Sequence, residues 1–194
     1  MQRVRIELSP TEIGLNQERL IKKVIADVGA TQLGFGYTTS SPSQNVRETK
    51  TWQTDYGPCT VNWYRPNTHP PAIGEVHTPD FDFWVNGQRL VNLESKNWQP
   101  GKYPLSLHQV EEKIISRVSG RPVLLGNVLV IGDLLCQEGD EQRILELLQQ
   151  YRFRVILTGR QAVSPEDETS YSIIRARLEP LLVDLFMLRW TMPN

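Results

Sequence analysis

The strongest structural signal in the chain is the stretch DFDFWVNGQRLVNLESK, residues 80–96. Asn86-Gly87 is a strong short-range signal for a β-hairpin, and it predicts two strands over residues 80–85 and 89–96. Side chains alternate between the two faces of a strand. One face of this hairpin is therefore apolar, and the other carries Asp80, Asp82, Asn92, Glu94 and Lys96.

The length of the turn decides which carboxylates meet. A two-residue turn would pair Asp80 with Leu93 and mix polar with apolar side chains on both faces, because opposed residues of a hairpin share a face. We therefore expect a turn of odd length, with Gly87 in the left-handed position of a bulged turn. In that register Asp80, rather than Asp82, lies nearer to Glu94.

Other patterns extend outward from the hairpin and predict an α/β fold. A capping box at Ser9 and Glu12 begins a helix, for which Gly29 is the expected stop, and residues 31–45 read as a loop. Further elements are a hairpin over 46–53 and 60–64, helices after Ser106 and Asp140, and strands over 128–131 and 153–157. Ser164-Pro165 starts a last helical region that Pro180 should kink or divide. The order predicts a mixed central β-sheet flanked by helices.

Length and composition exclude several classes of protein. With 194 residues, the chain fits one domain, with a core over about 16–160 and a C-terminal helical region over 165–190. Its 21 Lys and Arg nearly balance its 22 Asp and Glu, so nucleic acid could be bound only through a local basic patch. The two cysteines lack the spacing of a disulfide framework or a zinc site. No apolar run reaches membrane-spanning length, and we expect a soluble cytoplasmic protein.

The polar face of the hairpin has the chemistry of a metal site. Two converging carboxylates suit Mg²⁺, which keeps several waters and takes phosphate oxygens as further ligands. A lysine on the same strand face can orient the attacking water or stabilise the charge of a transition state. The alternative is a solvated face of an edge hairpin, in which Lys96 forms weak surface ion pairs.

These residues resemble a known motif. Pro79-Asp80 followed by Glu94-Ser95-Lys96 is similar to the PD-(D/E)XK nuclease superfamily, which includes restriction enzymes, Holliday-junction resolvases and transposon end-cutting nucleases. The resemblance implies a restriction-endonuclease-like core and metal-dependent hydrolysis of DNA phosphodiesters. It also implies Asp80 and Glu94 as ligands of Mg²⁺, which Mn²⁺ can replace, and Lys96 as the catalytic lysine.

Four further residues are candidates for an accessory role. Glu18, on the first helix, could add a metal contact or be an exposed carboxylate. Glu75 is similarly ambiguous, and Asp82 is expected at the margin of the site. Gln109 could lie near metal or DNA, but its spacing from Ser106 favours a capping box.

Two questions stay open: whether the protein is an enzyme, and how many copies of the chain assemble. The alternative to an endonuclease is a non-catalytic DNA-binding or protein-interaction module on a nuclease-like fold. Cutting both strands of a duplex needs two sites, so we expect a homodimer or a larger homo-oligomer. The last helical region, apolar over Leu181, Leu182, Leu185, Phe186 and Leu188, could supply the interface or could be buried against its own sheet.

Overall fold

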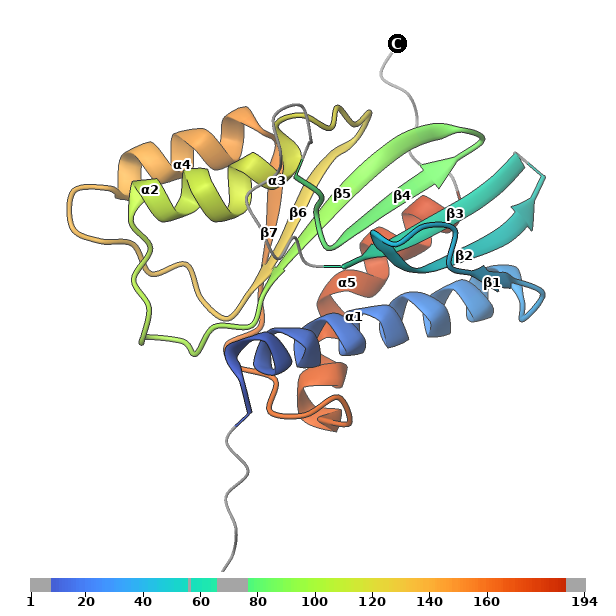
Figure 1. Ribbon diagram of the computed structural model, residues 1–194, viewed down its shortest axis with the longest axis horizontal. Helices are drawn as coiled ribbons and strands as arrows, with labels where there is room; N and C mark the ends of the chain where they lie inside the picture. Colours follow the sequence, from blue (N-terminus) through green and yellow to red (C-terminus); the bar gives the residue numbers. More distant parts are fainter. Residues whose placement is uncertain (1–7, 56, 66–76, 188–194) are drawn as a thin grey trace, which may run out of the picture.

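A computed structural model describes residues 8–55, 57–65 and 77–187. Within them the chain forms one mixed seven-stranded sheet, whose strands lie side by side in chain order (Figure 1). Strands β1 to β5 pair antiparallel, and β5, β6 and β7 pair parallel. The strands are β1 (Thr38–Ser40), β2 (Val46–Thr54), β3 (Gly57–Tyr64), β4 (Phe81–Val85), β5 (Gln88–Lys96), β6 (Gly126–Ile131) and β7 (Phe153–Leu157). The predicted α/β class with a mixed sheet is confirmed.

Helices cover both faces of the sheet, and the alternation along β6 shows how. Val128 and Val130 pack with the first core, which includes side chains of α1 (Pro10–Leu33) and α5 (Glu168–Phe186). Leu129 and Ile131 pack with the second core, which includes α4 (Glu141–Gln150). That second face also carries one continuous helix made of α2 (Leu107–Val110), the π-helical segment η1 (Glu111–Ile115) and α3 (Ser116–Val118). Figure 1 shows α2, α3 and α4 grouped over β5 to β7.

A β-bulge, rather than an odd-length turn, keeps the apolar and polar faces of the central hairpin apart. Asn86 and Gly87 form a two-residue turn with φ of 48° and 76°, and Val85 pairs with Gln88, so the expected odd-length turn is wrong. The register then shifts between Phe83 and Trp84, which leaves Leu90 as an extra residue in β5. This bulge restores the alternation, because one added residue moves all later side chains to the opposite face. As a result Phe81 pairs with Leu93, and Asp82 with Asn92.

Two elements between residues 29 and 40 differ from their predictions. The capping box at Ser9 and Glu12 is confirmed, but α1 continues through Gly29 to Leu33. Gly29 lies against Trp52, where a Cβ atom would stand 2.5 Å from the indole ring. The glycine therefore serves close packing between helix and sheet rather than a helix stop. Residues 38–40, expected in a loop, form the edge strand β1.

The last helix differs from its prediction at both its start and its proline. It begins after Asp167, whose side chain accepts a hydrogen bond from the Ser170 amide, and not at Ser164. Pro180 does not divide it. The apolar side chains of α5 that were candidates for a dimer interface lie within the protein's own core: Leu181, Leu182, Leu185 and Phe186; Leu188 lies outside the described residues. The part of the chain that the structure describes contains no helix long and apolar enough to span a membrane.

Candidate active site

A cavity of about 600 Å³ opens beside the end of the central hairpin. Its walls come from the start of α1, the residues before β4, the end of β5 and the helix that follows. Five of the residues predicted from sequence line it: Asp80, Glu94, Lys96, Glu18 and Gln109. The sheet and the two helix layers thus bring together side chains that are up to 91 positions apart between Glu18 and Gln109.

Asp80 is fixed at the start of β4. Its Oδ2 accepts a hydrogen bond of 2.7 Å from the backbone N–H of Ser95, and its own carbonyl accepts one of 2.9 Å from the N–H of Tyr64. Since Phe81 pairs with Leu93, the register places Asp80 beside Glu94. Burial raises the pKa of Asp80, although Lys96 and the Ser95 amide act in the opposite direction.

Glu94 and Lys96 form a pair on β5. Glu94 is 2% exposed, and its Oε1 accepts a hydrogen bond from Nζ of Lys96. Burial, with the neighbouring Asp80 carboxylate, raises the pKa of Glu94 to about 7. Burial lowers the pKa of Lys96, but the Glu94 and Asp80 carboxylates outweigh it, so that the pKa lies above its ordinary value. Lys96 is therefore a cation at neutral pH.

One oxygen of this pair has no partner. Oε2 of Glu94 is buried and forms no hydrogen bond with any residue that the structure describes. A buried polar atom without a partner costs about 1–3 kcal/mol. Such an atom, in a cavity wall beside a second carboxylate, is suited to a ligand or a cation.

Glu18 joins the site from α1. It is 8% exposed, and its Oε2 accepts a hydrogen bond of 2.8 Å from Nε1 of Trp63. Burial, together with the Asp80 carboxylate, raises the pKa of Glu18 to about 8. The helix is held against the sheet by Gln17, whose Nε2 donates to Ser95 Oγ at 2.8 Å and to the Val130 carbonyl at 3.1 Å. The alternative interpretation of Glu18 as an exposed helix carboxylate is therefore wrong.

The wall opposite α1 is basic and comes from the helix after β5. Gln109, Lys113 and Arg117 recur at intervals of four residues and line the cavity. Gln109 also completes the capping box with Ser106 that its spacing predicted. Lys113 and Arg117 supply the positive charge of this wall. Arg65, which directly follows β3, lines the cavity as well.

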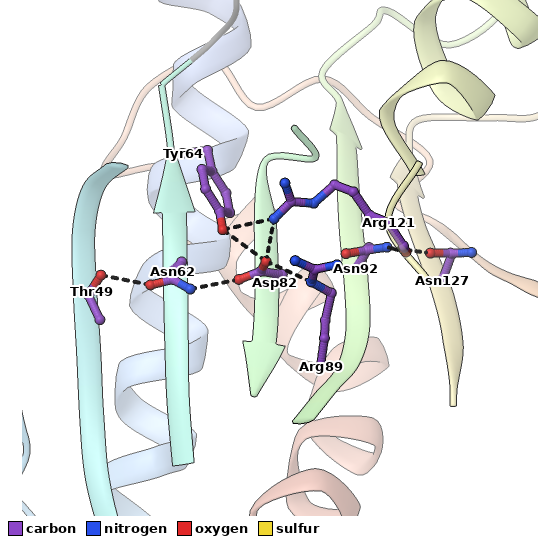
Figure 2. Close-up of polar contacts among 8 residues, drawn as sticks. All are labelled: Thr49, Asn62, Tyr64, Asp82, Arg89, Asn92, Arg121 and Asn127. Carbon is purple, nitrogen blue, oxygen red and sulfur yellow. Dashed lines mark hydrogen bonds and ion pairs between the residues drawn. The ribbon is translucent and has the colours of Figure 1, made fainter. Parts of the chain in front are cut away.

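Asp82 does not line this cavity, so the expectation of a place at its margin is wrong. The Asp82 side chain is fully buried and accepts from Asn62 Nδ2, Tyr64 OH and Arg121 at 2.8, 2.9 and 2.8 Å. A second ion pair joins it to Arg89 at 3.3 Å. Figure 2 shows these side chains converging on Asp82 from neighbouring strands and from the segment after α3. Glu75 lies outside the described residues.

The donor set fits a hard cation held by few protein ligands. Among residues 8–55, 57–65 and 77–187, no group of three or more His, Cys, Asp or Glu side chains is placed to hold an ion. Mg²⁺ needs only one or two carboxylates, because waters and substrate phosphates complete its shell. Asp80 and the unpartnered oxygen of Glu94 meet that requirement.

Comparisons with protein-family models, with curated proteins and with solved structures found no significant match.

Proposed function

We propose that this protein is a metal-dependent DNA endonuclease with a restriction-endonuclease-like core of the PD-(D/E)XK type. The observation that carries the proposal is the shared cavity. Asp80, Glu94 and Lys96 line one wall, with a buried Glu94 oxygen that lacks a partner. The surrounding architecture supports it, since the acidic residues lie on a central antiparallel hairpin whose second strand pairs parallel with β6.

The roles follow from the chemistry of each side chain. Asp80 and Glu94 would hold the cation, and Lys96, a cation paired with Glu94, would stabilise negative charge that develops on the phosphate. Lys113, Arg117 and Arg65 give the cavity a basic wall. That wall is the local patch that a chain of net charge −1 needs in order to bind DNA.

Mg²⁺ is the proposed cofactor, with Mn²⁺ as a substitute. When bound, it would neutralise phosphate charge and lower the pKa of a bound water. Burial raises the pKa of Glu94 to about 7, so metal binding at or below that pH would release a proton from this carboxyl.

A cleavage assay tests the function. Supercoiled plasmid, a four-way junction and single-stranded DNA are each incubated with Mg²⁺, with Mn²⁺ and with EDTA. We expect cleavage of at least one substrate with metal and none with EDTA. A protein that binds no Mg²⁺ or Mn²⁺ by calorimetry and cuts none of the substrates would instead be a non-catalytic DNA-binding or interaction module.

A further inference from the structure

Arg117 has a donor that is ready for an acidic group. It lines the cavity, and its Nε–H is buried without an acceptor among the residues described. No ion pair within 4.0 Å joins its guanidinium to a described carboxylate. Its charge acts against the burial that raises the pKa values of Asp80 and Glu94. A guanidinium that faces a cavity without its own counter-ion is suited to a phosphate, which it can bind through two parallel hydrogen bonds.

The helix that carries Arg117 is tied down just beyond its end. Arg121 follows α3 and is held at both its backbone and its side chain. Its carbonyl accepts from Asn92 Nδ2 at 3.0 Å, and its guanidinium donates to Asp82 at 2.8 Å and to Tyr64 OH at 3.0 Å. Figure 2 shows this arginine reaching across the sheet to Asp82.

A gain in stability does not by itself explain the buried ion pair between Asp82 and Arg121. The desolvation cost of a buried ion pair can exceed its Coulombic gain, and apolar side chains of similar volume often stabilise a fold as well or better. A buried charge pair can, however, fix one geometry among several. Here it fixes the point from which Arg117, four residues earlier, extends over the cavity.

We propose that Arg117 binds a phosphate of the substrate in the cavity and that Asp82, acting through Arg121, is the residue that positions it. The proposal rests on the proposed function, because it assigns the phosphate to DNA. It gives Asp82 a role that needs no contact with substrate. Asp80 and Asp82, two residues apart on one strand face, then serve the same site by different means.

Salt-dependent DNA binding tests both the phosphate contact of Arg117 and the positioning role of Asp82. A fluorescent 20-bp duplex is titrated by anisotropy over a range of NaCl, once with EDTA and once with Ca²⁺. The variants are Arg117→Ala, Asp82→Asn and the double variant, with Arg143→Ala as control, because Arg143 is exposed on α4 and pairs with Glu146. Each lost phosphate contact lowers the salt slope by about 1.

We expect a slope lower by about 1 for Arg117→Ala and for Asp82→Asn, no further loss in the double variant, and no change for Arg143→Ala. Thermal unfolding shows that each variant is folded at the assay temperature. If Asp82→Asn does not fold, Arg121→Lys replaces it, since lysine keeps the charge but exchanges the planar guanidinium, whose Nη2 donates to both Asp82 and Tyr64, for a flexible ammonium.

An unchanged slope for Arg117→Ala, or a wild-type protein that binds the duplex in neither buffer, overturns the proposal. A change for Arg117→Ala alone, with Asp82→Asn like wild type, overturns the role of Asp82. The proposed function fails separately: a wild-type protein that binds DNA with the expected slopes but cuts no substrate is no endonuclease, and its phosphate contact stands.

Discussion

The backbone N–H of Ser95 donates a hydrogen bond of 2.7 Å to the carboxylate of Asp80. This contact crosses from β5 to the residue that precedes β4, and it fixes Asp80 beside the strand that carries Glu94 and Lys96. The Ser95 hydroxyl accepts from Gln17 on α1 at 2.8 Å. A single serine between the glutamate and the lysine therefore joins the hairpin, the first helix and the cavity.

Removing the charge of any of the three central residues should abolish cleavage. We expect Asp80→Asn, Glu94→Gln and Lys96→Met each to lower the cleavage rate by about 100-fold or more, as for loss of one preorganised electrostatic group. Initial rates with Mg²⁺ measure the effect, and Arg143→Ala should cut at the wild-type rate. Folded variants that cut normally would show that the site has been assigned to the wrong residues.

Metal affinity should rise with pH between about 6 and 8. The pKa of Glu94 is raised to about 7, so a proton competes with the cation below that value. Isothermal titration with Mg²⁺ in two buffers of different ionisation enthalpy should show proton release that diminishes toward pH 8. Affinity that does not change across this range would contradict the role of Glu94 as a ligand.

Glu18→Gln should stabilise the metal-free protein at high pH. Because the pKa of Glu18 is raised to about 8 in the fold, its contribution to stability is complete below the ordinary value of 4.5 and is lost as pH rises through 8. Gln keeps an acceptor for Trp63 and carries no charge. Since about 1 kcal/mol shifts the Tm of a chain of this size by about 2–4 °C, thermal unfolding in EDTA can resolve the gain. We expect the variant to match wild type at pH 5 and to exceed it at pH 9; a constant difference would refute the buried charge.

Two glycines of α1 offer a matched pair. Gly29→Ala should destabilise the protein by about 1–3 kcal/mol, because the new Cβ would stand 2.5 Å from Trp52. Gly14→Ala meets nothing within 4 Å and should stabilise by up to about 1 kcal/mol through helix propensity. Urea unfolding measures both. Similar effects of the two changes would show that α1 does not pack on Trp52 as described.

We expect the active protein to be a homodimer or a larger assembly, because a duplex has two strands and each chain supplies one cavity with this set of residues. Light scattering with and without duplex DNA measures the mass. The interface should not involve the apolar side chains of α5, which are buried in the core. A stable monomer that makes double-strand breaks at full rate would disprove the assembly.

The local pattern of the sequence was enough to find the hairpin and to separate its two faces. Alternation of Phe81, Phe83, Val91 and Leu93 with polar residues identifies the apolar side of each strand. It could not identify how the register is kept. A bulge at Leu90 and an odd-length turn give the same alternation, and only the pairing of whole strands distinguishes them.

Contacts between distant segments decided the rest. Asp80 and Asp82 look alike in the sequence, since both are aspartates on one strand face. Arg121, which is 39 positions away from Asp82, covers and neutralises that residue, while Asp80 remains in the wall of the cavity. Gly29 likewise looks like a helix stop until Trp52 is placed against it. Strand periodicity is set by neighbours along the chain, whereas the burial and pairing of a charge depend on segments that only the folded chain brings together.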